Sequence, residues 1–211
     1  MIREIADARL PDSAICRAAY TLAEEASEPF LFNHVLRTYA FGFHAGTRAG
    51  LSFDSELFFL GAVLHDLGLT HAHRGADRFE IDGADAAAAF LRERGYDEPF
   101  IDVVWDAVAL HSTPAIPQRK RPEIALVQTG AGIDVGALPP DLLAPGVLER
   151  VVEDAPRLGF KKAMLAAIAD VVRDKPMTTA LNFTADIAAR QIDGFHRIDF
   201  CDAMAAAPFA E

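Results

Sequence analysis

A histidine and an aspartate stand side by side, His65-Asp66, within the otherwise apolar run 57–68. Burying two such polar groups without partners costs free energy, because each group loses its contacts with water. A divalent cation would satisfy both, provided that other parts of the chain supply further nitrogen or carboxylate ligands. His34 upstream and Asp134 downstream are candidates for that role. We therefore predict a metal-dependent enzyme.

The elements that must position these groups are helices, because apolar residues recur with a helical period and no stretch alternates like a strand. Proline and small polar residues mark the expected helix starts, and glycine or proline marks the ends. The predicted helices span residues 13–26, 29–45, 54–68, 84–94, 97–111, 122–134, 145–153, 160–173 and 178–191. The sequence thus predicts an all-α fold.

Length and composition indicate a single domain. A chain of 211 residues with 51% hydrophobic residues can bury a substantial core. No internal repeat and no linker composition marks a second unit, so we expect one helical bundle over residues 1–211. Its metal-binding core would cover about residues 30–135, and further helices and a tail would follow at residues 136–211.

The net charge of −11 argues against nucleic acid or an anionic membrane as a partner, because both bind basic surfaces. A small neutral or cationic substrate is easier to accommodate. The two cysteines, Cys16 and Cys201, lack the spacing of a thiolate zinc site or a disulfide framework. Together with a charged start and no apolar run of roughly 18 residues, this predicts a cytoplasmic protein. The alanine-rich helices are compatible with a homo-oligomer.

The ligand candidates occur in the order His, His-Asp, Asp, within segments 33–37, 64–68 and 132–135. In this order the chain resembles the HD-domain superfamily of metal-dependent hydrolases, over roughly residues 30–135. It is similar, more narrowly, to the cyanamide hydratase-like branch of that superfamily. The closer likeness lies in segments 34–42, 78–84 and 109–112. The resemblance implies an HD-domain-like helical bundle that binds a catalytic metal ion.

One departure from the superfamily bears on the number of metal ions. HD enzymes with two metals commonly have a histidine four residues before a Gly-Ala pair and further histidines downstream. Here Phe79 stands four residues before Gly83-Ala84, and only His111 follows. We therefore expect one divalent ion, for which zinc suits the ligand types best, although iron, manganese or nickel can occupy the same set. The expected ligands are His34, His65, Asp66 and Asp134.

The resemblance implies hydration of cyanamide or a related small nitrile-like compound by a metal-bound water, which would give urea from cyanamide. Asp66 could accept the proton of the water while it ligates the metal, and His111 could donate a proton or orient the substrate. Glu80 or Asp82 could bind the amino group of the substrate. Their structural alternatives are a solvated loop acid for Glu80 and a helix N-cap for Asp82.

Two other functions remain open at this stage. The first is hydrolysis of a nucleotide or another phosphate ester, which needs cationic groups to balance the phosphate charge. Near the motifs only Arg37, Arg74 and Arg78 could supply them. Arg37 lies on the same helix face as His34, where it could instead pair with a buried acid. The second is a metal-stabilised regulatory or ligand-binding domain without turnover.

Overall fold

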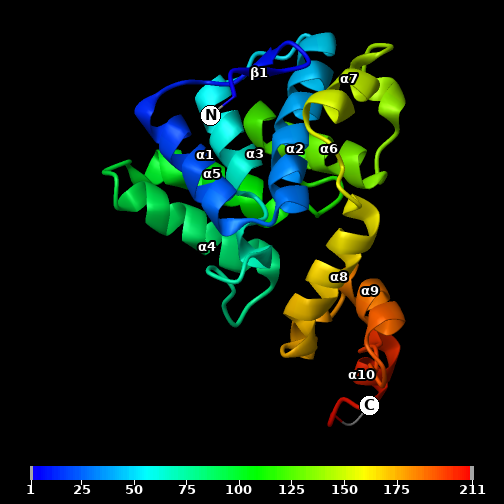
Figure 1. Ribbon diagram of the computed structural model, residues 1–211. Coiled ribbons are helices and arrows are strands. Elements are labelled where there is room, and N and C mark those ends of the chain that lie inside the picture. Colours follow the sequence, from blue (N-terminus) through cyan, green and yellow to red (C-terminus); the bar gives the residue numbers. More distant parts are fainter. Residues whose placement is uncertain (1, 210–211) are drawn as a thin grey trace.

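The computed structural model describes residues 2–209, and helices dominate them, which confirms the all-α prediction (Figure 1). None of the helices in that range combines the length and the apolar character needed to cross a membrane. The α-helices are α1 (Ala14–Ala26), α2 (Pro29–Arg48), α3 (Ser55–Leu64), α4 (Phe79–Arg92), α5 (Glu98–Leu110), α6 (Pro122–Val135), α7 (Val147–Asp154), α8 (Phe160–Arg173), α9 (Thr184–Gln191) and α10 (Phe200–Ala205). The 3-10 turns are η1 (Leu67–Leu69), η2 (Pro117–Arg119), η3 (Pro140–Leu142) and η4 (Pro176–Thr179).

A short antiparallel hairpin near the N-terminus was not expected from the sequence. Strand β1 (Glu4–Ile5) pairs with β2 (Ala8–Arg9), so that Ile5 lies opposite Ala8. Two residues per strand are too few to show a repeating alternation of apolar and polar side chains. The hairpin contacts α2 and α7, and it does not reach the candidate site.

Most helices begin where the local sequence predicts. The side chains of Ser13, Asp54 and Asp97 accept hydrogen bonds from backbone N–H groups in the first turns of α1, α3 and α5. Such caps satisfy donors that have no partner inside the helix. Pro29 and Pro122 stand at the first positions of α2 and α6, where a missing N–H costs nothing.

Several predicted helix boundaries were wrong, and one of them is the end of α3, which lies at Leu64 rather than near residue 68. Helix α4 begins at Phe79 rather than at residue 84, so Asp82 lies in its first turn and is not the N-cap. The carboxylate of Asp82 instead accepts a hydrogen bond from the backbone N–H of Asp77, which belongs to the preceding loop. The last predicted helix is divided into η4 and α9, because the chain leaves helical geometry at Leu181, whose φ is +57°.

The core lies where α3 is surrounded by α1, α2, α5 and α6 (Figure 1). Every residue from Leu57 to Leu64 is buried, as the apolar run predicts. Helices α2 and α6 approach unusually closely, because a β-carbon at Gly130 would lie only 1.9 Å from the carbonyl oxygen of Thr38. The missing side chain of Gly130 therefore permits this close helix packing. The approach also sets the end of α6 beside the start of α2.

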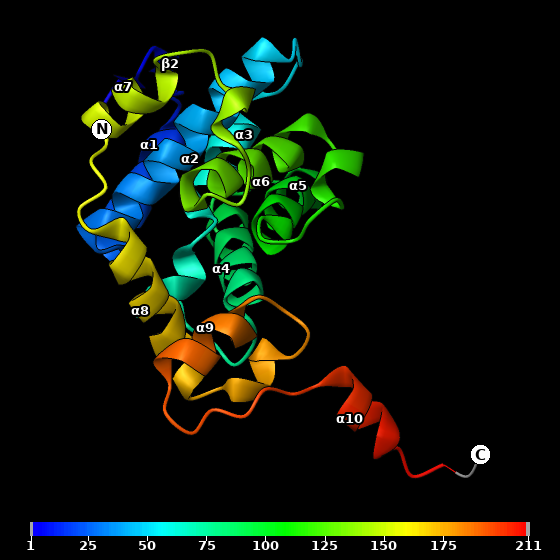
Figure 2. The same ribbon diagram turned by 90° about the vertical axis from the view of Figure 1, so that its right-hand side faces the viewer.

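The C-terminal helices lie along one end of this bundle. Helix α8 runs across the end at which α2 begins, and α9 and α10 lie beyond it (Figure 2). A second, smaller apolar cluster attaches α8 to α2, η1 and α4, separate from the main core. Its buried members are Leu31, Leu69, Phe79, Phe160, Met164, Ile168 and Val171. Every residue of α10 is exposed, so that helix adds nothing to the core.

Candidate metal centre

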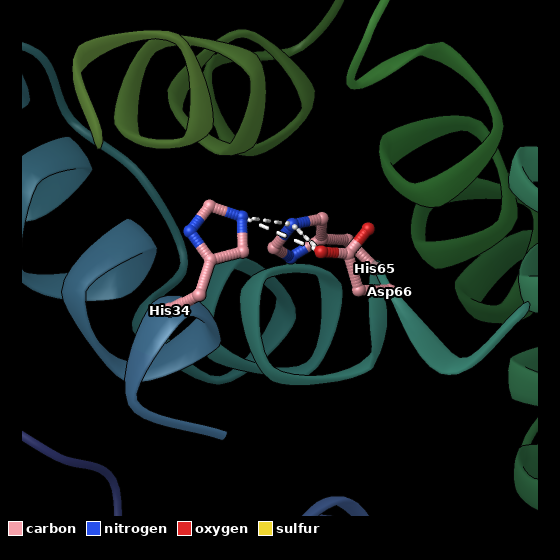
Figure 3. A group of neighbouring side chains, drawn as sticks. All are labelled: His34, His65 and Asp66. Atoms are coloured by element: carbon pink, nitrogen blue, oxygen red, sulfur yellow. Dashed lines mark hydrogen bonds and ion pairs between the residues drawn. The ribbon is translucent and has the colours of Figure 1, made fainter. Parts of the chain in front are cut away.

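Three of the four expected metal ligands converge at one buried point (Figure 3). His34 comes from the second turn of α2, His65 ends α3, and Asp66 follows it directly. The Nε2 atoms of the two histidines are 3.2 Å apart. The Oδ2 atom of Asp66 lies 3.4 Å from Nε2 of His34 and 3.3 Å from Nε2 of His65. This is the spacing of ligands that share one ion.

The hydrogen bonds of the two Nδ1 atoms determine which nitrogen of each histidine ring carries the proton. Nδ1 of His65 lies 2.8 Å from the carbonyl oxygen of Ala62, and Nδ1 of His34 lies 2.6 Å from a carboxylate oxygen of Asp134. Both oxygens can only accept hydrogen bonds, so each Nδ1 carries a proton and the Nε2 of each neutral ring presents a lone pair. Oδ2 of Asp66 is buried without a hydrogen-bond partner. Facing lone pairs repel one another, and a cation among them would remove that cost.

The electrostatics of the group agree with this arrangement. Burial raises the pKa of the Asp66 carboxyl, but His65 and the neighbouring imidazoles outweigh it and hold this pKa well below its usual range. Burial lowers the pKa of His34, and the nearby carboxylates only partly oppose that shift. Burial also lowers the pKa of His65, yet the Asp66 carboxylate reverses the net direction. At neutral pH the ionised Asp66 thus lies beside the neutral ring of His34, and a bound metal would replace the proton that Asp66 favours on His65.

A third imidazole, that of His111, faces the same carboxylate from the end of α5. Its Nε2 lies 3.6 Å from Oδ1 of Asp66, and its ring centre lies 4.7 Å from that of His65. Its Nδ1 contacts the carbonyl oxygen of Val108 at 2.6 Å, so its Nε2 also presents a lone pair. Burial, followed by the nearby His65, lowers the pKa of His111 to about 4. The structure therefore brings this expected catalytic residue to the group as a neutral ring.

Asp134 occupies a different place from the one expected. Its Oδ2 accepts hydrogen bonds from Nδ1 of His34 and from Nη2 of Arg37, at 2.6 and 2.7 Å. Its Oδ1 accepts from Nε of Arg37 and from Nη1 of Arg157, at 2.8 and 2.6 Å. Among the described residues, the group that could hold a metal is His34, His65 and Asp66, without Asp134. Asp134 lies behind His34, so its ligation of a metal stays a prediction that this geometry does not support.

The pairing expected for Arg37 is confirmed, and its partner is the buried acid Asp134. Two further neighbours were missed by the sequence analysis. Arg157 reaches Asp134 from the loop before α8, and the Phe160 ring stacks on the His34 ring with centroids 4.8 Å apart. Neither residue belongs to a motif, and the distance of each from the ligands along the chain does not indicate a contact. The packing of α8 against the bundle brings both of them to the site.

The two residues expected to bind substrate have different surroundings. Glu80 is buried rather than solvated, and its carboxylate accepts hydrogen bonds from Arg78 at 2.8 Å and from the Ser112 hydroxyl at 2.6 Å. Because Ser112 follows His111, Glu80 lies on the His111 side of the group. The carboxylate of Asp82 instead accepts a hydrogen bond from Lys175 at 2.5 Å. Asp82 thus ties α4 to the end of α8.

Comparison with protein-family models finds an HD domain at residues 31–143, a segment that includes the whole metal group. The chain belongs to the HD-domain family. HD domains are generally metal-dependent hydrolases or phosphohydrolases that bind a divalent ion. No curated protein gives a significant match.

The matched HD domain ends before α8. Two residues outside the match reach this part of the site, because Arg157 contacts Asp134 and Phe160 stacks on His34. The smaller apolar cluster joins this segment to the HD domain through Leu31, Leu69 and Phe79. The HD domain itself supplies the candidate ligands, and α8 adds an aromatic ring against one of them.

Proposed function

We propose that this HD-domain protein is a metal-dependent hydratase that acts on cyanamide or a related small nitrile-like compound and forms urea from cyanamide. One observation carries the proposal most directly. The Nε2 atoms of His34 and His65 and the unpartnered Oδ2 of Asp66 converge in a buried site, as possible ligands of one ion. Three protein ligands with a position left for water or substrate form the usual catalytic zinc arrangement.

The ligand types favour zinc, and iron, manganese or nickel fit the same set. When bound, such an ion lowers the pKa of water toward about 7, which supplies a nucleophile at neutral pH. The site favours one ion, because the position at which two-metal HD enzymes have a histidine is Phe79. Its ring centre is 5.6 Å from that of His111 and offers no ligand atom.

The side chains beside the ligands can position and move protons. Oδ1 of Asp66 and Nε2 of His111 are two neighbouring acceptors 3.6 Å apart, and a water beside them would donate a hydrogen to either. The neutral His111 would accept the proton of the attacking water and return it to the nitrogen of the nitrile. The Ser112 hydroxyl and the Glu80 carboxylate, which are hydrogen-bonded to each other on the same side, would receive the amino group of the substrate.

The surrounding charges favour a neutral substrate over a phosphate ester. The three arginines that could balance a phosphate each pair with an acid in the structure. These pairs are Arg37 with Asp134, Arg74 with Asp170 and Arg78 with Glu80. Phosphoryl transfer needs cationic groups aimed at its developing charge, and pairing with carboxylates removes most of that effect.

The direct test measures urea released from cyanamide by purified protein, in parallel with phosphate released from a panel of nucleotides. We expect urea formation that requires the metal, and little phosphate release. Robust phosphate release without urea formation would make the chain a phosphohydrolase instead. Neither product, together with full metal occupancy and a tightly bound metabolite, would indicate a binding domain without turnover.

The metal centre is tested separately by elemental analysis of protein purified without added metals. We expect close to one divalent ion per chain, and its loss together with urea formation in His65→Ala. His71→Ala is the matched control, because His71 lies exposed in the loop after η1. Equal metal content in the wild type and in His65→Ala would contradict the proposed centre.

A further inference from the structure

The start of α8 packs on one side of the buried metal group. His34 and His65 are at most 2% exposed and Asp66 is 4% exposed, so a substrate cannot reach them without a movement of their surroundings. Phe160, the first residue of α8, lies nearly parallel to the His34 ring, with centroids 4.8 Å apart and an interplanar angle of 28°. Phe160 is therefore the side chain that stacks directly on a ligand from outside the HD domain.

We propose that the Phe160 ring is the gate of the metal centre and the residue that limits substrate size. The role in substrate size rests on the proposed hydratase function. The role as a gate for the metal ion does not. Displacement of the ring would uncover the face of His34, and its return would narrow the space beside the metal group. Phe160 would thus be a specificity-determining residue.

The ring is held by contacts that are attractive yet reversible. The guanidinium carbon of Arg157 lies 4.5 Å from the Phe160 ring centre, and that of Arg37 lies 5.1 Å from it. Such cation–π contacts are modest in strength and directional. Asp134 fixes both guanidinium groups through its two oxygens, so the closed position of the ring is defined by the same acid that orients His34.

The chain before Phe160 has the geometry of a tight turn. Leu158 and Gly159 both have left-handed backbone conformations, with φ of +49° and +74°. Leu158 is 57% exposed, so its side chain does not anchor the turn in the core. A non-glycine residue in this conformation is disfavoured, which lowers the cost of a rearrangement just before α8.

Helix α8 is also attached separately from the main core. Its buried residues, Met164 and Ile168 among them, belong to the smaller apolar cluster rather than to the one around α3. Segments with few buried apolar contacts open at lower free energy than the whole fold. Opening at the start of α8 would therefore separate the smaller cluster and leave the core around α3 packed.

The test compares Phe160→Ala with Met164→Ala. Met164 lies one turn further along α8 in the same apolar cluster, so its substitution weakens the attachment of α8 without removing the stack. The first measurement is the rate at which zinc-loaded protein loses its ion to an excess of chelator, and the rate at which metal-free protein takes zinc up. We expect both rates to rise about tenfold in Phe160→Ala, and clearly less in Met164→Ala.

The rates of zinc uptake and zinc loss distinguish a Phe160 ring that controls access from one that only holds His34 in place. A gate speeds uptake and loss together and leaves zinc affinity nearly unchanged. If the ring only held His34 in place, loss alone would accelerate and affinity would fall, and the proposal would be overturned. Equal rates in Phe160→Ala and the wild type would overturn it as well. These measurements need no turnover, so they stand even if cyanamide is not the substrate.

The second measurement compares kcat/KM for cyanamide with that for a bulkier neutral analogue, N,N-diethylcyanamide. The ratio should shift toward the bulkier compound in Phe160→Ala, less in Phe160→Leu, and not in Met164→Ala. Phe160→Leu keeps most of the apolar volume, so it still tests the idea if the alanine variant folds poorly. An unchanged ratio in both Phe160 variants would contradict the role in substrate size.

Discussion

His34 and His65 face each other through their Nε2 atoms, 3.2 Å apart, while the Nδ1 atom of each ring already contacts an oxygen acceptor. With a proton on each Nδ1, the two facing nitrogens present only lone pairs. Without a cation, burial disfavours a second proton on His65, but the Asp66 carboxylate outweighs burial and raises the pKa of this ring. A bound metal would replace this proton. The folded chain thus builds the site before the ion binds.

The stability of the metal-free protein should depend on pH through His111. Burial lowers its pKa to about 4, below its ordinary value of 6.5. Below pH 6.5 the unfolded chain therefore binds a proton that the folded protein does not, and stability falls as the pH falls toward 4. Compared with His111→Gln, the wild type should lose about 2 kcal/mol more between pH 7 and pH 5. Urea unfolding with chelator present measures this. The same loss in both proteins would contradict the shift.

Asp134→Asn should destabilise the protein strongly even when no metal is bound. Asp134 neutralises the fully buried Arg37 and also accepts hydrogen bonds from Arg157 and His34. Loss of the negative charge leaves a buried guanidinium without a counter-ion, at a cost of about 3–5 kcal/mol. Urea unfolding of the chelator-treated variant checks this expectation.

Asp170→Asn is the matched control for that variant. Asp170 pairs with Arg74 at the surface, so its loss should cost less than about 1 kcal/mol. If Asp134→Asn weakened only the metal-loaded protein, Asp134 would act as a ligand rather than as the residue that orients His34. Elemental analysis of the same samples distinguishes these two outcomes.

Gly130→Ala should be far more harmful than Gly132→Ala, although both lie in α6. A β-carbon at Gly130 would meet the Thr38 carbonyl oxygen at 1.9 Å, so the α2 and α6 backbones would have to separate. Overpacking of this kind costs about 3 kcal/mol. At Gly132 the nearest atoms belong to the Leu138 side chain, which can rotate, and alanine gains about 1 kcal/mol of helix propensity. Urea unfolding compares the two variants, and similar losses would contradict this account.

The two cysteines should differ sharply in reactivity. Burial raises the pKa of the Cys16 thiol to about 12, so only about one molecule in ten thousand carries the thiolate at pH 8. Cys201 lies exposed on α10. We expect the native protein to react rapidly at one thiol, and at both once it is unfolded in urea. Peptide mass analysis after alkylation identifies the site, and Cys201→Ser removes the fast reaction. Rapid labelling of Cys16 in the folded protein would contradict its burial.

Local sequence signals predicted most of the fold. The bounds predicted for α8 agree with the structure, and the capping residues Ser13, Asp54 and Asp97 mark helix starts because a cap acts within one turn. The start of α4 was missed because Asp82 resembles a cap in sequence but binds the Asp77 backbone and Lys175 instead. Lys175 lies on a distant segment, which no local pattern indicates.

The sequence alone determined which side chains could hold a metal. His34, His65 and Asp66 are ligand types that stand in apolar helical segments, in the order His, His-Asp. Only the tertiary structure decided that Asp134 lies behind His34 and that Phe160 covers it. Both contacts join residues about a hundred or more positions apart, and they depend on how α6 and α8 pack against α2. Packing of that kind is set by the shapes of whole helix faces, so spacing along the chain does not reveal it.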